Sequence, residues 1–258
     1  MGTVSKAMTL LTLFTPERST IGLSEFARLA KMNKATTHRL LGELLAFGMV
    51  EQEQAAKTYR LGSEVLRLAA LRELAVPMMA VVQKALKSLS DETHETAHMS
   101  MVQGDNLITY AHVYSTRFAT GVMMEDAEVL SFHATSSGKA ILAFADQKFQ
   151  NRILSKPLTK HTQQTATDPA VVRTMLREVE ETGVAVSTGG YEAEVHSFAA
   201  PVFNAQRNPF AAVAVAMPVS RMEAIPANKI ARAVSTRADQ VTRAVGGIWP
   251  SNYPGMPG

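Results

Sequence analysis

The chain has 258 residues, of which 46% are hydrophobic and 19% are charged, a length that accommodates two domains with buried cores. No uncharged apolar run reaches the roughly 18 residues of a membrane-spanning helix, and the absence of cysteine excludes disulfides and thiolate chemistry. Without a signal-peptide pattern at the N-terminus, we expect a cytoplasmic protein with no membrane partner.

The net charge of +3 is unevenly distributed along the chain. Residues 1–72 contain ten Lys or Arg and six Asp or Glu, whereas the remainder contains sixteen and seventeen. The excess of positive charge therefore lies in the N-terminal part of the chain. Binding to DNA phosphates requires an excess of this kind. Because many small domains carry four excess charges, this observation gains weight only with the elements described next.

Two helices are predicted first. Apolar residues have helical spacing over residues 4–14, and Pro16 and Gly22 then bracket a loop. Ser24 is the expected N-cap of a second helix over residues 24–30, which has one apolar face.

A third helix follows after a break of three residues. Asn33 is its expected N-cap, its apolar face extends through residues 34–47, and Gly48 ends it. Two helices joined by so short a turn are typical of a helix-turn-helix. The start of such a second helix contacts base edges and phosphates, so the expected contacts are Lys34, Thr36, Thr37, His38 and Arg39. An ordinary solvated helix face is the alternative interpretation.

A small hairpin is predicted directly after this helix. Residues 49–52 and 58–61 read as two short strands around a polar turn, and together they form the wing of a winged helix-turn-helix. The side chains expected to contact phosphate or the minor groove here are Lys57, Tyr59 and Arg60. Ser24 completes the predicted DNA-binding set.

Six ordered motifs carry a family resemblance. They are Gly22–Ala27, Lys34–Leu41, Tyr59–Gly62, His133–Ala140, Phe198–Phe203 and Phe210–Val215. In this order, over residues 4–245, the chain resembles the IclR family of bacterial transcription regulators. The resemblance implies a winged helix-turn-helix domain, a linker helix that helps to pair two subunits, a GAF-like effector-binding domain, and a homodimer or tetramer on double-stranded operator DNA. The corresponding ranges are 1–62, 63–76 and 77–248.

The elements beyond the hairpin predict an α+β fold in which helices cover a sheet. Expected helices span residues 64–73, from Pro77 to about 91, 137–145, 168–181 and 226–245. Expected strands span residues 95–102, 107–114, 184–187, 195–203 and 210–217. The helix at 64–73 can equally be a plain amphipathic helix packed on its own domain. We expect residues 249–258, rich in proline and glycine, to form a flexible tail.

The resemblance also implies an effector pocket. Its residues are Ser136, Ser137, Ser187, Ser197, Ala214 and Ala216. A glyoxylate-type pocket has an aspartate at position 187, a cysteine at 197 and serines at 214 and 216, so the floor here is less polar. We therefore expect a larger or more apolar effector, such as an aromatic or aliphatic acid, with its carboxylate at the start of the helix near Ser137. The alternative is that Ala214 and Ala216 are ordinary core residues. Met99, Met101, Met123 and Met124 either line the cavity or pack in the core.

Parts of three enzyme motifs are present, and none has the context that its chemistry requires. His94, Glu95 and His98 match H-E-x-x-H, but the pattern after Glu95 predicts a strand, on which the two histidines lie about 13 Å apart. Ser136 and Lys139 match S-x-x-K without the accompanying motifs of serine acyl-enzymes, and the glycine-lysine pair lacks the rest of a phosphate loop. We therefore expect no catalytic residues, metal or cofactor. The alternatives are a small-acid hydrolase or zinc enzyme using His94, Glu95 and His98, and a ligand-binding protein whose head contacts another protein.

Overall fold

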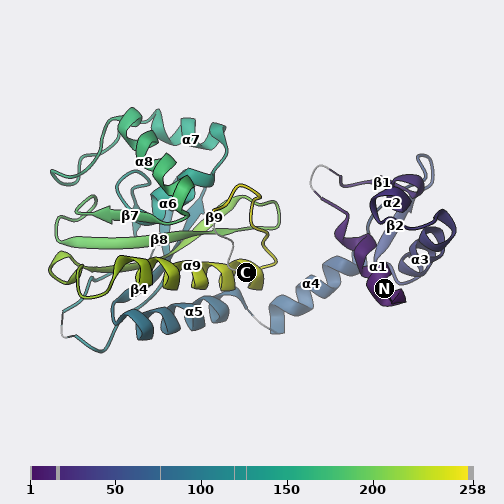
Figure 1. Cartoon of the computed structure of the whole chain (residues 1–258), viewed down its shortest axis with the longest axis horizontal. Helices are drawn as coiled ribbons and strands as arrows, with labels where there is room; N and C mark the ends of the chain where they lie inside the picture. The colour runs from purple at the N-terminus through teal and green to yellow at the C-terminus, as the bar shows by residue number, and fades with distance from the viewer. Residues whose placement is uncertain (1, 16–17, 76, 119, 126, 255–258) are drawn as a thin grey trace. The chain divides into compact units, whose positions relative to one another are not determined.

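The computed structural model describes residues 2–15, 18–75, 77–118, 120–125 and 127–254. The chain divides into two compact units, Met1–Pro77 and Met78–Gly258, each with its own hydrophobic core (Figure 1). The predicted loop residue Pro16 lies outside the described residues, as does the end of the predicted tail, residues 255–258. In the part of the chain that is described, none of the helices is both long and apolar enough to cross a membrane.

The first unit is a winged helix-turn-helix, as predicted. Its elements are α1 (Thr3–Thr12), β1 (Ile21–Gly22), α2 (Leu23–Leu29), α3 (Lys34–Ala46), β2 (Val50–Glu53), β3 (Thr58–Leu61) and α4 (Ser63–Ala75). The three strands form an antiparallel sheet in the order β1-β3-β2. Strand β1 was not predicted, because two residues are too few for an alternating pattern. Fully buried Leu10, Phe26 and Leu41 join the helices to the hairpin in one core.

The helix caps in this unit were predicted with mixed success. The Asn33 side chain accepts a hydrogen bond from the Thr36 backbone N–H at 2.8 Å, which confirms it as the N-cap of α3. Gly48 follows the end of α3 with a φ of 67°, a left-handed conformation that favours glycine. The prediction of Ser24 as a cap was wrong. The N-cap of α2 is Gly22, because this residue still pairs with Thr58 of β3 and the helix begins immediately after it.

The second unit has helices on both faces of a six-stranded sheet. Its helices are α5 (Met78–Thr93), α6 (Ser136–Phe144), α7 (Gln147–Leu154), α8 (Pro169–Thr182), η1 (Val219–Arg221) and α9 (Ala227–Ala244). Its strands are β4 (Thr96–Gln103), β5 (Asn106–Val113), β6 (Val129–Leu130), β7 (Ala185–Thr188), β8 (Val195–Phe203) and β9 (Pro209–Pro218). The strand order is β6-β5-β4-β9-β8-β7, and all these neighbours are antiparallel. Helices α7 and η1 were not predicted.

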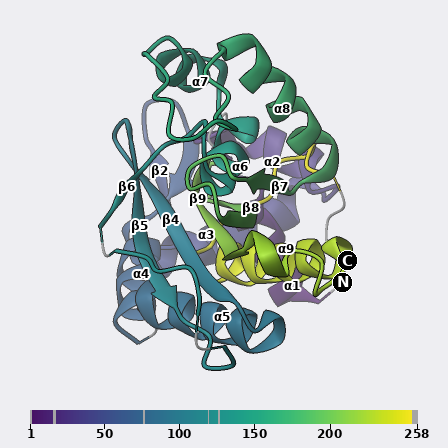
Figure 2. The same cartoon turned by 90° about the vertical axis from the view of Figure 1, so that its left-hand side faces the viewer.

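The alternation of side chains along the central strands builds two separate cores. On one face of the sheet, Val213 and Val215 of β9 pack against α5 and α9, while on the other face Ala212 and Ala214 pack against α6 and α8. Figures 1 and 2 show α5 and α9 on one side of the sheet, with α6, α7 and α8 on the other. The start of α6 therefore lies against the β7-β8-β9 side of the sheet.

The segment after α9 is packed rather than flexible as far as residue 254, which corrects the tail prediction for these residues. The Tyr253 ring lies 4.2 Å from the Trp249 ring and 5.8 Å from the Phe203 ring, centroid to centroid. The Tyr253 hydroxyl donates a hydrogen bond to the Gly183 carbonyl at 2.8 Å. The surface that these two aromatic side chains bury therefore holds the segment in place, although proline and glycine residues surround them in the sequence.

Candidate functional site

The first candidate site is the exposed face of α3 in the winged helix-turn-helix unit. Lys34, His38 and Arg39 are exposed and Thr36 is half-buried, while the opposite face buries Leu40 and other core residues. The exposed side chains lie in the first two turns of the helix, where recognition helices contact base edges. They include two permanent cations, so this face has the charge and the position that DNA contact requires.

The hairpin contributes two exposed cations, Lys57 and Arg60, although Glu51 and Glu53 leave its net charge at zero. Lys57 is exposed in the turn between β2 and β3 and adopts a φ of 52°. Arg60 is also exposed, and its Nη2 lies 3.0 Å from Glu51 Oε2. An exposed ion pair of this kind contributes little free energy, so the Arg60 side chain can exchange Glu51 for a phosphate at small cost.

The structure does not place three of the sequence-predicted residues as expected. Thr37 has 0% exposure and its hydroxyl donates to the Asn33 carbonyl at 3.0 Å, so it supports the cap of α3 instead of facing solvent. Tyr59 is 4% exposed and its ring packs edge-on against Phe26 at 6.1 Å. Thr37 and Tyr59 are therefore buried in the core of this unit, and their contact with DNA stays a prediction. Ser24 is exposed on α2, although it does not cap that helix.

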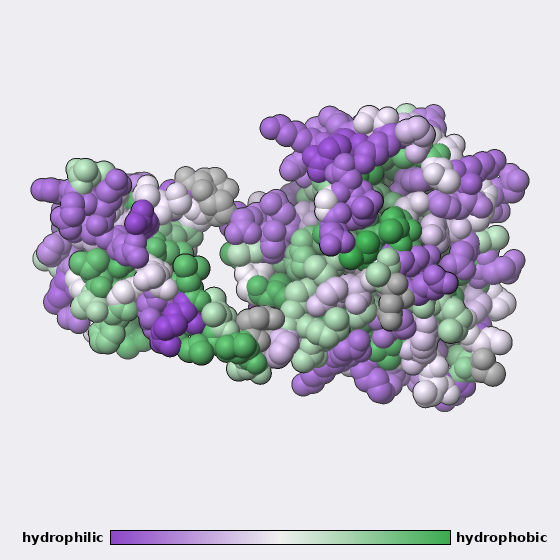
Figure 3. Space-filling view, turned by 180° about the vertical axis from the view of Figure 1, so that it is seen from behind, coloured by the Kyte–Doolittle hydropathy of each residue, from purple (hydrophilic) through white to green (hydrophobic). Residues whose placement is uncertain are grey.

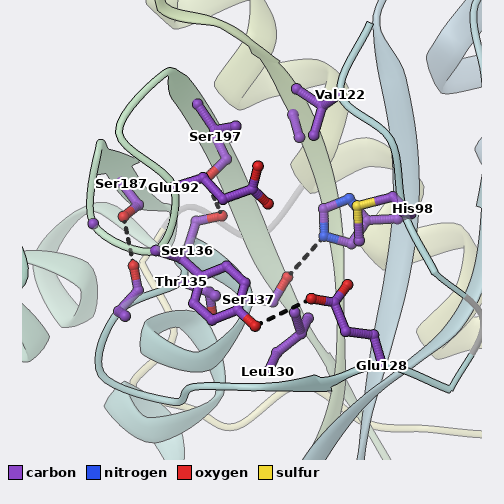
Figure 4. A pocket seen from close by; sticks show the side chains of 16 residues that line it. His98, Val122, Glu128, Leu130, Thr135, Ser136, Ser137, Ser187, Glu192 and Ser197 are labelled. Atoms are coloured by element: carbon purple, nitrogen blue, oxygen red, sulfur yellow. Dashed lines mark hydrogen bonds between the residues drawn. The ribbon is translucent and has the colours of Figure 1, made fainter. Parts of the chain in front are cut away.

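The second candidate site is a pocket in the unit Met78–Gly258, where α6 begins beside the sheet. Its cavity volume is about 50 Å³, and it brings together five of the six residues predicted for the effector pocket. These are Ser136, Ser137, Ser187, Ser197 and Ala216. Figure 4 shows the four serines around one side of the pocket and His98 on the other. The serines come from α6, β7 and β8, so segments about 60 residues apart in the chain meet here.

The wall formed by α6 consists of the first turn of this helix. The Thr135 hydroxyl caps this turn by accepting the Gly138 N–H at 3.0 Å. A Cβ at Gly138 would lie 2.3 Å from the Phe132 carbonyl oxygen, so only glycine permits this approach. The first N–H groups of a helix have no acceptor within the helix, and those of Ser136 and Ser137 therefore remain suited to an anion.

Hydrogen bonds between side chains and backbone hold the serines in place. Ser136 Oγ donates to Ser197 Oγ at 2.8 Å, which joins α6 to β8. Ser187 Oγ donates to the Ala134 carbonyl at 2.8 Å and so joins β7 to the start of α6. These hydrogen bonds join three elements at the wall of the pocket without a bound ligand.

Ala214 does not line this pocket. Its side chain is fully buried in the core between the sheet and α6, two residues along β9 from Ala216. The alternative that it is an ordinary core residue therefore holds for Ala214. Of the four methionines considered, Met124 lines the pocket, whereas Met99 is buried in the core against α5 and α9.

His98 projects from β4 into the pocket and is 5% exposed. Its Nε2 lies 3.4 Å from Ser137 Oγ, and its buried Nδ1 has no hydrogen-bond partner among the described residues. Burial, together with the smaller effect of the nearby His112, lowers the pKa of His98 to about 4. The ring is therefore neutral at physiological pH and offers one donor and one acceptor.

Acidic and aromatic residues at the mouth of the pocket were missed by the sequence analysis. Glu128, Tyr191 and Glu192 line the pocket, and the Tyr191 hydroxyl donates to Glu128 Oε1 at 3.1 Å. Burial and the adjacent Glu128 carboxylate raise the pKa of Tyr191 to about 12. These residues lie in the segment before β6 and in the turn between β7 and β8, and neither segment has a periodic pattern that would mark it in the sequence.

The structure separates the residues of the H-E-x-x-H motif. Helix α5 ends at Thr93 and His94 has a φ of 58°, while His98 lies within β4. The Glu95 carboxylate forms an ion pair with Arg221, with Oε1 and Nε 2.6 Å apart. The helical face that presents two histidines and a general base to zinc is therefore not formed.

The S-x-x-K pair is also not assembled. Ser136 Oγ donates to Ser197, whereas Lys139 Nζ donates to the Val186 carbonyl at 2.6 Å. Lys139 lines a neighbouring cavity, and burial lowers its pKa to about 8. The serine–lysine contact that acyl-enzyme chemistry needs is replaced by two structural hydrogen bonds.

A winged helix-turn-helix and a separate α/β unit with a preformed pocket, in one chain, define a ligand-responsive transcription regulator. Comparison with known proteins assigns the family. Residues 3–54 match the IclR helix-turn-helix domain, and residues 69–243 match the C-terminal domain of the bacterial transcriptional regulator IclR. The chain belongs to the IclR family.

Individual relatives agree with this assignment. The transcriptional repressor IclR of Escherichia coli is 26% identical over 95% of this chain and 90% of its own length. The glycerol operon regulatory protein of Streptomyces griseus is 29% identical over 94% and 96%. The crystal structure of a chain from Silicibacter sp. TM1040, described as an IclR transcriptional regulator, is 50% identical with a TM-score of 0.82, and covers 99% of this chain and 100% of that one.

Proposed function

We propose that a small molecule bound in the α6 pocket controls how the head of this regulator, residues 1–62, binds double-stranded operator DNA. In this proposal residues 63–76 form the linker helix and residues 77–248 the effector-binding domain. The observation that carries it is the convergence of Ser136, Ser137, Ser187, Ser197 and Ala216 on one cavity at a helix N-terminus. Ligand-binding sites are typically preformed cavities with a few polar groups of this kind.

The proposed DNA contacts are the exposed members of the predicted set. They are Ser24, Lys34, Thr36, His38, Arg39, Lys57 and Arg60. Arg39 is assigned to a base edge, because its guanidinium can form two hydrogen bonds to guanine. The lysines are assigned to phosphates, which supply affinity without sequence preference.

We further propose that the protein acts as a homodimer or tetramer. Helix α4 exposes four leucines, Leu66, Leu68, Leu71 and Leu74, with exposures of 74%, 43%, 49% and 79%. This apolar surface is visible in Figure 3. An exposed apolar surface of this extent on a helix supports pairing with a second copy. Two heads would then contact half-sites about 34 Å apart along the duplex, or a multiple of that distance.

The proposed effector carries a carboxylate and is larger or more apolar than glyoxylate. The N–H groups at the start of α6 suit the carboxylate, and Val122, Leu130 and Ala216 provide apolar wall around it. An IclR homolog from Microbacterium hydrocarbonoxydans, 21% identical with a TM-score of 0.59, has been crystallised with 4-hydroxybenzoate. That aromatic acid belongs to the ligand class proposed here.

An enzymatic role is not part of the proposal. Ser137 and His98 both line the pocket, and the 3.4 Å between Ser137 Oγ and His98 Nε2 is long for a nucleophile and its base. No carboxylate orients the ring, because His98 Nδ1 lacks a partner among the described residues. We propose a cytoplasmic regulator that needs no cofactor.

The head is tested by measuring binding of the full chain to the intergenic DNA beside its own gene over a series of salt concentrations. Arg39→Ala should cost about 1–3 kcal/mol of specific binding free energy. Arg177→Ala, which removes an exposed arginine on α8, is the matched control and should leave binding unchanged. Equal effects of the two substitutions, or no sequence-specific binding at low salt, would overturn the proposal.

A further inference from the structure

The mouth of the α6 pocket is acidic. Glu128, from the segment before β6, and Glu192, from the turn between β7 and β8, both line the pocket. Figure 4 shows Glu128 on the side that also holds His98, and Glu192 nearer to Ser197 and Ser136. Glu128 is half-buried and Glu192 is more exposed. Among the side chains that line this pocket in the described part of the chain, none belongs to lysine or arginine. With His98 neutral, the side chains of the pocket carry net negative charge.

The two carboxylates are close enough to influence each other. Burial, followed by the charge of Glu128, raises the pKa of Glu192 above its usual range. Glu128 accepts one hydrogen bond, from Tyr191, whereas an ionised carboxylate has about four acceptor sites. No ion pair joins Glu128 or Glu192 to a described cation. Within the described residues, protein groups therefore neutralise neither carboxylate, and both keep acceptor sites open to solvent or to a ligand.

The start of α6 provides hydrogen-bond donors to the pocket. The first N–H groups of α6, at Ser136 and Ser137, lie at the positive end of the helix dipole. His98 contributes a second, independent sign of a missing ligand, because its Nδ1 is buried in the pocket wall and has no partner among the described residues. Buried polar atoms are rarely left unpaired, and a ligand or an ordered water supplies the partner in such cases.

From this arrangement we infer that the effector is zwitterionic: a carboxylic acid that also bears a protonated amine. Its ammonium group contacts Glu128 and Glu192, and its carboxylate contacts the first turn of α6. A simple acid would add a third negative charge beside two carboxylates, whereas an amino acid supplies the cation that this pocket lacks. The inference rests on the proposed function and narrows the proposed class of organic acids to those with an amine.

The inference is tested with matched pairs of compounds on the full-length protein. The panel consists of the proteinogenic amino acids and the deaminated acids with the same carbon skeletons, for example L-phenylalanine with 3-phenylpropionate and L-leucine with 4-methylpentanoate, together with 4-hydroxybenzoate. Titration calorimetry measures each affinity. The tightest binder should carry an amine, and its deaminated counterpart should bind about 10- to 100-fold more weakly, because a charge-assisted hydrogen bond is lost.

Substitutions then locate the amine. Glu192→Gln should reduce the preference for the aminated member of the pair by about 10-fold. Glu194→Gln removes the same charge two residues away, from a side chain that lines a different cavity, and should leave the preference unchanged. The fluorescence of Trp249, the single tryptophan, verifies that each variant is folded.

Deaminated acids that bind as tightly as their aminated partners, or the absence of any amine-bearing binder, would overturn the inference. Binding to the intergenic DNA is measured in parallel with each compound. If simple acids bind and change DNA affinity, the amine assignment fails while the proposed function stands. If specific DNA binding itself is absent, the proposed function fails, whatever the panel shows.

Discussion

The ion pair between Glu95 and Arg221 supports the segment that forms one wall of the pocket, and its loss has a calculable effect. Arg221 Nε and Nη2 lie 2.6 and 2.7 Å from the two carboxylate oxygens. Arg221 also donates to the Thr120 carbonyl at 3.0 Å and stacks over the Phe118 ring at 4.5 Å. The same segment continues to Val122, which lines the pocket.

Arg221→Met should therefore destabilise the unit Met78–Gly258. Removing one partner of a buried ion pair costs about 3–5 kcal/mol, because the other charge remains buried. The Glu95 side chain is 4% exposed and that of Arg221 is 18% exposed, so we expect the lower end, about 3 kcal/mol. At a urea dependence of about 2 kcal/mol per molar, the unfolding midpoint should fall by about 1.5 M. Fluorescence of Trp249 reports on this unit alone.

Two further variants make the experiment decisive. Arg152→Met breaks an exposed pair with Asp105, for which we expect a loss below about 1 kcal/mol. Combining Arg221→Met with Glu95→Gln should restore part of the stability, because no unpaired carboxylate then remains buried. Midpoints that fall equally for Arg221→Met and Arg152→Met would refute the reasoning, as would a double variant less stable than Arg221→Met.

Three other predictions follow. Because the folded-state pKa of His98 is about 4, against 6.5 for a free histidine, the unfolded chain binds a proton between these pH values that the folded chain does not. The free energy of unfolding should therefore fall as pH drops from 6.5 to 4. In urea titrations, His98→Gln should remove up to about 3 kcal/mol of this decrease. A variant with the same pH profile as the wild type would contradict this prediction. Tyr253→Phe leaves the Gly183 carbonyl unpaired and should cost about 1–2 kcal/mol, whereas a truly flexible tail would show no change. Gly190→Ala places a Cβ 2.5 Å from the Ala134 carbonyl oxygen, so it should cost about 1–3 kcal/mol and weaken ligand binding in calorimetry; wild-type affinity and stability would contradict this.

The elements of the fold were predictable where local patterns are strong. Helix α3 has both a capping residue and apolar periodicity, and its observed limits lie within one residue of those expected. Strand β8 was predicted with its exact limits, since its hydrophobic run is bounded by a turn on each side. Helix α7 is short and mostly polar, so its eight residues offered no comparable pattern.

The direction of individual side chains was less predictable. Tyr59 was expected on the surface because it is polar and lies in the wing, but its position in β3 faces Phe26 and the core. Thr37 was expected to contact DNA as a neighbour of Thr36, although one residue along a helix turns the side chain by about 100°. Such errors arise because a motif specifies the element but not which of its faces is buried.

The pocket shows the same limit. The start of α6 was identifiable from the motif around Gly138, and the serines of β7 and β8 from the family resemblance. The acidic mouth was not, because Glu128 and Glu192 come from irregular segments that only the tertiary fold brings together. His98 was considered only as a member of an enzyme motif, since its burial depends on the pairing of β4 with β9.

The central claim is that the pocket and the head are coupled, and reciprocal titration tests it most directly. The affinity of the full chain for its operator fragment is measured with and without a saturating pocket ligand, and the affinity for the ligand is measured with and without the fragment. Because coupling between two sites is reciprocal, both affinities should change by the same factor, about 5-fold or more. A ligand that fills the pocket and leaves DNA affinity unchanged would contradict the account.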